Sequence, residues 1–193
     1  MNAPPRTRFT LFSRLLHWAM AAMVLAMFGI GMAMVTSLGN YHALVALHRP
    51  LGLAVLVLVV VRFVNRLMNP PPPLPATVGR VERFAALSGE YTMYALMFLL
   101  PLVGWGMLSA AHYPIILGGV RLPEILPHSA ALFATLRKAH TGLAYLFFLT
   151  FMAHFAAVLF HALVVRDGIL KRMTLGNRPA DERPALAPGT GET

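Results

Sequence analysis

The distribution of apolar residues along the chain predicts four membrane-spanning helices. Runs dense in Leu, Val, Ala, Met and Phe cover approximately residues 14–36, 46–67, 90–110 and 138–165. Each run can cross a hydrocarbon core of about 30 Å, which takes roughly 20 helical residues. None of them alternates apolar and polar residues as the strands of a membrane barrel would. We therefore expect an all-α protein, an integral membrane four-helix bundle.

Turn-forming residues mark the connections between these spans. The first connection is a short turn near residues 37–40, and the longest is the loop from about 111 to 137. Between the second and third spans, the prolines at 70–73 and 75 exclude a helix. Ser88 follows as the expected N-cap of the third span. The third span itself contains Pro101, Gly104 and Gly106, which indicate a kink or a close helix contact.

The chain is predicted to hold one domain between two short terminal segments. Residues 14–172 form the transmembrane domain, preceded by an N-terminal segment at 1–13. The N-terminal apolar run is too long for the apolar region of a signal peptide, and we expect it to be a retained span. Residues 173–193 are rich in Pro, Gly and charge, and we expect this tail to be disordered.

Charge supports the membrane interpretation. Only 12% of the residues are charged, against about a quarter in a typical soluble domain, and the net charge is +9. The basic residues gather before the first span, around the connection of the second to the third, and after the fourth: Arg6, Arg8, Arg14, Arg62, Arg66, Arg80, Arg83, Arg166, Lys171, Arg172, Arg178 and Arg183. Only Arg49, Arg121, Arg137 and Lys138 lie on the other side. This asymmetry predicts that both termini are cytoplasmic, and it explains the basicity without nucleic acid as a partner.

Histidines within the spans are the main candidates for chemistry. Residues 140 and 154 in the fourth span are 14 positions apart, which is about 21 Å of rise and nearly four complete turns. His140, His154 and, seven residues further, His161 therefore project from one stripe of the helix. A single buried histidine in a span is more simply a hydrogen-bonded helix contact, but several at matched depths indicate ligands.

Two further histidines provide partners for this stripe. His48, at the outer end of the second span, is level with His140, and His17 in the first span lies on the inner side, towards which His154 points. The pairs His48–His140 and His17–His154 thus predict two sites, each with two histidines, at two depths of the membrane. The inner pair requires helix tilt, because His17 looks shallower than His154 when counted from the flanking charges.

Neighbouring residues favour haem over a bare metal ion. Gly52 and Gly142 leave room for a flat macrocycle beside His48 and His140. Three arginines near the histidines are candidate partners for haem propionates, although each also fits anchoring at the membrane surface: Arg14, Arg49 and Arg62. Zinc and di-iron sites require carboxylates, or three or four ligands at one depth of the membrane. Glu90 is the one carboxylate in the predicted spans. The chain has no cysteine, which excludes thiolate ligands.

The sequence resembles the prokaryotic cytochrome b561 family, which includes the b-type cytochrome subunits of nickel hydrogenases. The matching stretches are SRLLHW (13–18), LHRPLG (47–52), VVVRFVNRLMNPPPPLP (59–75), YALMFLLPLVGWGM (94–107) and KAHTGLAYLFFLTFMAHFAAVLFHALVVRDGILKRM (138–173). The resemblance implies a bacterial inner-membrane four-helix bundle with two haem b groups, held by His17, His48, His140 and His154. Family members commonly have a histidine four residues before the tyrosine that aligns with Tyr94, where this chain has Glu90.

A haem with two axial histidines has no open coordination position, so it carries electrons. With no nicotinamide or flavin motif in the chain, we expect ubiquinone to be the lipid-soluble partner. The resemblance implies two alternatives. In one, the protein is a superoxide oxidase that reduces ubiquinone, with Arg49, Arg137 and Lys138 steering the anion unless they hold propionates or lipid headgroups. In the other, it is the haem-containing membrane anchor of a hydrogenase or dehydrogenase. A colourless transporter or scaffold is the non-redox alternative.

Reduction of a quinone also consumes protons, which requires a titratable group near its headgroup. His161 and Glu90, both near the inner side, are the candidates for quinone binding or proton delivery. Their simpler interpretations are a histidine complementing the helix dipole and an acid in the first helical turn after Ser88. No residue is assigned a catalytic role from the sequence.

Overall fold

A computed structural model describes residues 8–73, 78–117 and 119–175 of the 193-residue chain. Its four long helices are α1 (Leu11–Thr36), α2 (Tyr41–Met68), α3 (Arg80–Ala110) and α4 (Ala130–Phe160), the last continued by a π-helical turn, η2 (His161–Val165). All four are long and apolar enough to span a membrane. Large apolar side chains such as Val35, Met68 and Leu163 are exposed along them, as expected for surfaces that face lipid. The predicted fold class is confirmed.

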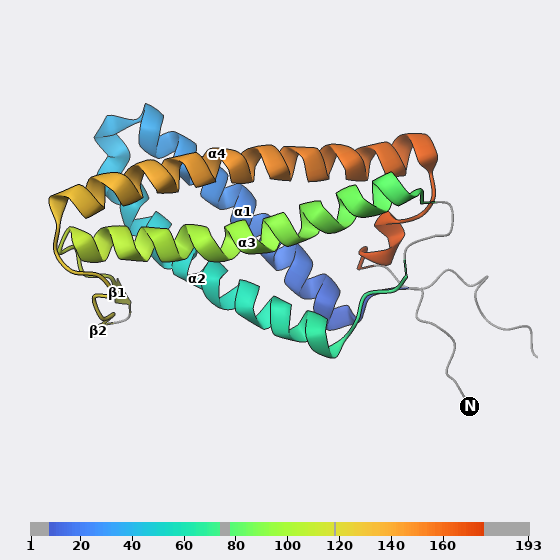
Figure 1. Ribbon diagram of the computed structural model, residues 1–193, viewed down its shortest axis with the longest axis horizontal. Coiled ribbons are helices and arrows are strands. Elements are labelled where there is room, and N and C mark those ends of the chain that lie inside the picture. Colours follow the sequence, from blue (N-terminus) through green and yellow to red (C-terminus); the bar gives the residue numbers. More distant parts are fainter. Residues whose placement is uncertain (1–7, 74–77, 118, 176–193) are drawn as a thin grey trace, which may run out of the picture.

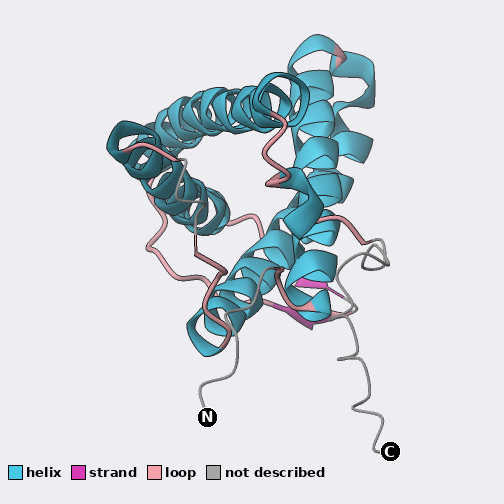
Figure 2. Cartoon of the chain, turned by 90° about the vertical axis from the view of Figure 1, so that its right-hand side faces the viewer, coloured by secondary structure: helices cyan, strands magenta, loops and turns pink. Residues whose placement is uncertain are grey.

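The helices alternate in direction and form two antiparallel pairs, α1 with α2 and α3 with α4, and α2 also packs on α3 (Figure 1). Viewed along the bundle, the four helices are arranged around a common centre (Figure 2). We call the end that holds the start of α1 and the end of α4 the terminal end, and the opposite end, with the α1–α2 turn, the loop end. The middle of the bundle is packed by apolar side chains: Met20, Val24, Val55, Val59, Leu96, Met97 and Phe147, with the Tyr94 ring.

Aromatic contacts connect α1 to α4 across the bundle. The ring of Phe28 lies 5.2 Å from that of Phe147, 5.4 Å from that of Phe148 and 5.4 Å from that of Phe151. Tilted and edge-to-face arrangements at this distance are the favourable ones for aromatic rings. This cluster separates the loop-end histidines from the terminal-end histidines along α4.

Helix starts follow local capping chemistry. The Thr10 hydroxyl accepts from Ser13 N–H at 3.2 Å at the start of α1, and the Ser129 hydroxyl accepts from Leu132 N–H at 3.2 Å at the start of α4. Each satisfies a backbone donor that the first helical turn leaves free. Both helices therefore begin before the apolar run that signals the span.

The prediction that Ser88 caps the third span is wrong. Helix α3 begins eight residues earlier, at Arg80, where the Glu82 carboxylate accepts from the backbone N–H of Gly79. Ser88 lies inside the helix and donates its hydroxyl to the Ala85 carbonyl. The segment from 80 to 87 is rich in good helix formers, so the helix extends beyond the apolar residues that mark the membrane.

The connections agree with the turn signals where they are described. A short 3₁₀ turn, η1 (Leu38–Asn40), joins α1 to α2, and the prolines at 70–73 follow the end of α2 without helix. Pro75 lies outside the described residues. The loop between α3 and α4 contains a small hairpin, β1 (Ile116–Leu117) paired antiparallel with β2 (Val120–Arg121).

After α4 the chain turns back onto the start of α1 through a short 3₁₀ helix, η3 (Leu170–Arg172). The Trp18 indole donates to the Met173 carbonyl at 2.9 Å, and Arg14 donates to the Thr174 carbonyl at 2.7 Å. The backbone N–H of Phe9 donates to the Arg172 carbonyl at 3.4 Å. The first residues that the sequence assigned to the tail thus pack against α1, and residues 176–193 lie outside the described chain.

Candidate haem sites

The imidazoles of His48 and His140 come together at the loop end. They project from α2 and α4, their ring centroids are 6.2 Å apart, and their planes are inclined by 70°. A metal ion bound to one nitrogen of each of two imidazoles separates the ring centroids by about 6 Å, because each metal–nitrogen bond is about 2 Å long. The observed spacing therefore fits an ion held between the two rings.

Helix α3 supports one face of this pair. A Cβ atom added to Gly104 would lie 3.4 Å from Cε1 of His140 and 3.6 Å from its Nδ1, so the ring rests against the α3 backbone where a side chain is missing. The Leu100 carbonyl, one turn before Gly104 on α3, also lies near the His140 ring. The glycine predicted as a close helix contact therefore positions a candidate ligand.

At the terminal end, His17 and His154 both lie near Arg62. The Arg62 guanidinium lies 3.1 Å from Nδ1 of His17, and it also interacts electrostatically with His154. His17 and His154 interact electrostatically with each other as well. His154 is exposed, and an imidazole in a membrane span needs a polar partner.

The Arg62 contact fixes the tautomer of His17. A guanidinium can only donate, so Nδ1 of His17 accepts and the ring proton resides on Nε2. Binding a metal through Nε2 requires the reverse arrangement, with the proton on Nδ1. A metal at Nε2 would therefore release Arg62 from His17, and Arg62 keeps its second contact, a 3.0 Å hydrogen bond from Nε to the Tyr94 hydroxyl.

Unpaired polar atoms provide a test of the haem interpretation. Buried polar groups in folded proteins are nearly always hydrogen-bonded, so each exception calls for an explanation. In the described part of the chain, the buried side-chain nitrogens without a partner are Nε of Arg14, Nδ1 of His48, Nε of Arg49, an Nη of Arg62 and Nδ1 of His140. All five residues are ones that the sequence assigned to haem, as axial ligands or as propionate partners. The arginines fit a haem, whose propionates supply carboxylates for their free donors. At His48 and His140, iron would bind through Nε2 and leave the unpaired Nδ1 as a protonated donor.

The candidate propionate partners lie at both ends. Arg49, next to His48, places its guanidinium 5.8 Å from the centre of the Tyr113 ring, a cation–π contact. Arg14 and Arg62 belong to the terminal end, where Arg14 also donates to the Thr174 carbonyl. Each arginine has a protein contact and a spare buried donor, so each can hold its position and still bind an anion.

Glu90, a candidate for proton delivery, is paired with a cation. Its carboxylate lies 2.5 Å from one terminal nitrogen of Arg66 and accepts from the other at 2.9 Å. A cavity of about 30 Å³, enough for roughly one water molecule, adjoins the pair; it is lined by Phe9, Ser13, Arg62, Asn65, Arg66, Asn69, Pro71, Glu90, Tyr94 and Met173. Glu90 and Arg62 both line this cavity and so belong to one polar region at the terminal end. In the same region the side-chain amide of Asn65 donates to the Ser13 hydroxyl at 2.7 Å.

His161 has a partner that sequence reasoning missed. It begins the π-helical turn η2 after α4, and its Nδ1 lies 2.7 Å from a carboxylate oxygen of Asp167. The two residues are six positions apart, a spacing that does not bring side chains together in an α-helix. The sequence signal that could have found Asp167 is the glycine after it, which permits the chain reversal.

Arg137 and Lys138 are exposed at the loop end, one turn before His140. With Phe133, Ala134 and Thr141 they line an open groove of about 500 Å³. Both cations lie next to a candidate ligand and are accessible from outside the bundle. Such an arrangement raises the local concentration of small anions.

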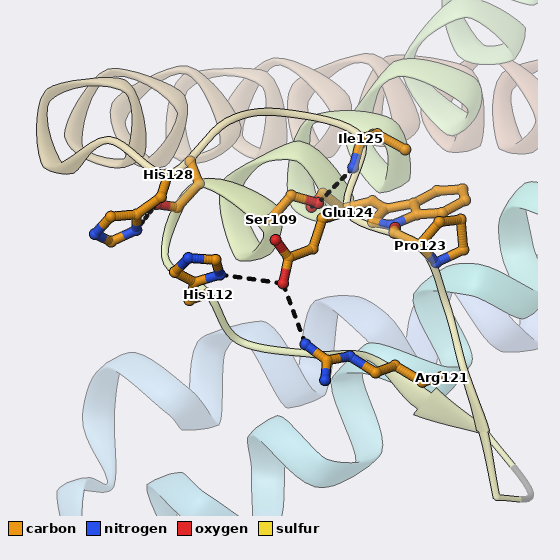
Figure 3. A network of polar contacts seen from close by, with 9 residues as sticks. Ser109, His112, Arg121, Pro123, Glu124, Ile125 and His128 are labelled. Carbon is orange, nitrogen blue, oxygen red and sulfur yellow. Dashed lines mark hydrogen bonds and ion pairs between the residues drawn. The ribbon is translucent and has the colours of Figure 1, made fainter.

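At the loop end, a polar network that sequence analysis did not identify lies between the α3–α4 loop and the end of α3 (Figure 3). Glu124 accepts from His112 at 3.1 Å and from Arg121 at 3.2 Å, while the Ser109 hydroxyl accepts from Ile125 N–H at 3.2 Å. His112 stacks on His128, with ring centroids 4.6 Å apart. The hydrogen bond from His112 is the main reason that the pKa of the exposed Glu124 carboxyl lies below its usual value; burial opposes it, and the charges of His112 and Arg121 lower the pKa further. The network ties the α3–α4 loop to the end of α3.

A membrane-spanning four-helix bundle with histidines paired at its ends defines a class of protein, the membrane b-type cytochromes. Comparison with known proteins gives the family. The profile of prokaryotic cytochrome b561 matches residues 8–176. The chain belongs to the prokaryotic cytochrome b561 family, whose members are haem b proteins of electron transport.

Two relatives show how similar this chain is to known sequences. It is 31% identical to "Cytochrome b561 homolog 2" of Escherichia coli (strain K12) over 185 residues, which cover 93% of this chain and 96% of the relative. It is 29% identical to "Probable superoxide oxidase CybB" of Yersinia pestis over 127 residues, which cover 66% of this chain and 72% of that protein. The first likeness extends over nearly the whole of both chains.

Proposed function

We propose that this protein is a dihaem superoxide oxidase of the bacterial inner membrane, which takes electrons from superoxide and reduces ubiquinone. His48 and His140 would hold one haem at the loop end, and His17 and His154 the other at the terminal end. The single observation that carries the proposal is the coincidence of the unpaired buried nitrogens with the predicted haem-binding residues. It supports haem at both ends, because Arg49 has an unpaired buried nitrogen at the loop end, and Arg14 and Arg62 each have one at the terminal end.

When bound, haem would supply one-electron redox chemistry, and two axial histidines would leave its iron without an open position. The reaction has a simple balance. Two superoxide ions each lose one electron and leave as dioxygen, and the two electrons with two protons convert a quinone into a quinol. The chain's own residues would attract the anion, hold the porphyrins and deliver protons.

Exposed cations at the loop end support superoxide as the electron donor. Arg137 and Lys138 line the open groove just before His140, and Arg49 lies beside His48. Superoxide is a small anion, so a concentration of positive charge near the loop-end site would speed its arrival without binding it tightly. The Yersinia pestis relative is named a probable superoxide oxidase, which agrees with this donor, whereas the name of the Escherichia coli relative specifies no electron donor.

The terminal end would face the cytoplasm and reduce the quinone. The excess of arginine and lysine around the start of α1, the start of α3 and the residues after α4 supports that orientation. His161 and Glu90 both belong to this end, and either could deliver a proton to a quinone oxygen. Arg66 already engages the Glu90 carboxylate, which makes His161 the better candidate.

A purified, haem-loaded protein should remove superoxide and reduce a short-chain ubiquinone in proportion, two superoxide ions for each quinol. The double variant Arg137→Gln/Lys138→Gln should lower the second-order rate with superoxide by about tenfold at low salt and flatten its salt dependence. Arg80→Gln/Arg83→Gln, at the opposite end, is the matched control and should match the parent.

The alternative is a membrane anchor that passes electrons from a docked dehydrogenase or hydrogenase to quinone. It predicts haem-loaded protein that is reduced by a co-purifying redox partner and that does not react with superoxide. Loss of superoxide reactivity in the parent protein, with both haems in place, would therefore refute the superoxide role. Colourless protein would refute electron transfer altogether.

A further inference from the structure

At the terminal end of α4, His161 and Asp167 form a hydrogen-bonded pair that no sequence motif predicts. Helix α4 changes to the π-helical turn η2 at His161, Arg166 then adopts a left-handed conformation with φ of 56°, and Gly168 follows with φ of 76°. The backbone N–H of Arg166 donates to the His161 carbonyl at 2.7 Å and closes the turn. This reversal brings Asp167 back to His161, with 2.7 Å between Nδ1 and a carboxylate oxygen. Left-handed backbone at a residue other than glycine is uncommon and often marks a functional site.

Both carboxylate oxygens of Asp167 have a donor. One accepts from His161, and the other accepts from the backbone N–H of Ile169 at 3.1 Å. Burial raises the pKa of Asp167, but the hydrogen bonds from Ile169 and His161 outweigh burial and hold the pKa below its usual value. The carboxylate is therefore ionised at neutral pH and can only accept, which requires the His161 proton to be on Nδ1.

The consequence concerns the other nitrogen of the ring. With Nδ1 committed to Asp167, Nε2 of His161 is the ring nitrogen left to exchange a proton with another group. The neighbouring Arg166 donates its Nε to the Leu163 carbonyl at 3.1 Å and is not a partner of Asp167 in this pair. His161 also lies on the stripe of α4 that carries His154, seven residues and about 10 Å of rise away.

We propose that Asp167 is the positioning residue of the proton-delivery site; this proposal rests on the proposed reduction of quinone. Asp167 holds His161 with Nδ1 protonated, so that Nε2 donates a proton to the reduced quinone oxygen. The proton that leaves Nε2 becomes one of the two O–H groups of the quinol, and a proton from the aqueous side replaces it on Nε2. The second O–H takes its proton from the aqueous side as well. The electrons reach the quinone separately, from the haem site, so the dyad itself undergoes no redox change.

Asp167→Asn separates this role from a structural one. Asparagine keeps an oxygen for Ile169 N–H but presents an NH₂ group to His161, and a donor at that place favours the proton on Nε2 instead of Nδ1. We expect quinone reduction about tenfold slower or more, with both haem spectra unchanged. Asp167→Glu, which restores an acceptor, should recover much of the rate. Glu82→Gln, at the start of α3 on the same side, is the matched carboxylate control and should leave the rate unchanged.

The tautomer can be measured independently of activity. Solid-state NMR of protein labelled with ¹⁵N-histidine in lipid should show a protonated Nδ1 for the signal that disappears in His161→Leu. In Asp167→Asn that signal should change to the form protonated on Nε2, and in Asp167→Glu it should return. An unchanged tautomer in Asp167→Asn would overturn the proposal. A slower rate that Glu does not recover, at an unchanged tautomer, would show a merely structural role and overturn it too.

The failure of the proposed function has a different signature. If the parent protein reduces no ubiquinone, then quinone reduction is wrong, whatever the tautomer of His161. If the parent protein reduces ubiquinone and Asp167→Asn does so at the parent rate, then only the role of Asp167 is wrong.

Discussion

The imidazoles of His48 and His140 face each other at 6.2 Å across the space between α2 and α4. Helix α2 packs on α1 and α3, and α4 packs on α3, so these rings join two helices that pack little on each other directly. Gly104 of α3 supports the His140 ring from the side. One ligand pair thus depends on three helices, which makes it sensitive to substitutions far from either histidine in sequence.

Removing one ligand from each end should remove one haem at a time. His140→Ala and His154→Ala are each expected to lower the haem content from about two per chain to about one, because a haem with one remaining histidine is held weakly. Pyridine haemochrome assays and reduced-minus-oxidised spectra measure this. His42→Ala, an exposed histidine at the loop end, is the control and should keep the full content. Full haem content in both ligand variants would contradict the assignment.

The size of residue 104 should control the loop-end site alone. A Cβ at this position is in ordinary contact with the His140 ring, so Gly104→Ala should bind haem like the parent. Gly104→Leu should displace the ring and lower the loop-end haem signal by about half or more. Gly89→Leu is a matched control on the same helix, since nothing lies within 4 Å of its added Cβ. A parent-like spectrum of Gly104→Leu would show that His140 does not rest on this glycine.

Breaking the ion pair of Glu90 with Arg66 should weaken the terminal end. The side chains are 33% and 16% exposed, so Glu90→Gln leaves a half-buried guanidinium without its counter-charge. We expect a loss of about 1 kcal/mol in the free energy of unfolding, read as a lower melting temperature in detergent. The double variant Glu90→Gln/Arg66→Gln should recover part of that loss. Equal melting temperatures for Glu90→Gln and the parent would mean that the pair is not stabilising.

Acid should loosen the loop between α3 and α4. The pKa of Glu124 is lowered by its hydrogen bond from His112, so this contact stabilises the loop above the ordinary value of 4.5 and is lost as the pH falls below it. The Trp105 indole donates to the Pro123 carbonyl, the residue before Glu124, at 3.1 Å, so its fluorescence should report the change. Trp18→Phe leaves Trp105 as the one tryptophan. Glu124→Gln should remove the transition, and an identical acid transition in that variant would exclude Glu124 as its source.

Sequence alone determined the features that depend on one helix at a time. Runs of apolar residues predicted four spans, and the helical repeat placed His140, His154 and His161 on one stripe. Both are properties of local geometry, which a helix of known period imposes. The ends of the helices do not follow from the apolar pattern. The apolar residues of the third span begin after Ser88, whereas α3 begins at Arg80.

Tertiary structure decided which side chains meet. Arg62 lies with His17 and Tyr94, and Asp167 folds back on His161; neither contact has a fixed spacing in the sequence. The first depends on the tilt of α1 against α2, and the second on a π-helical turn followed by left-handed backbone. Contacts of this kind depend on packing between helices and on a chain reversal. The free energy that stabilises both is distributed over many residues, so no short sequence motif specifies them.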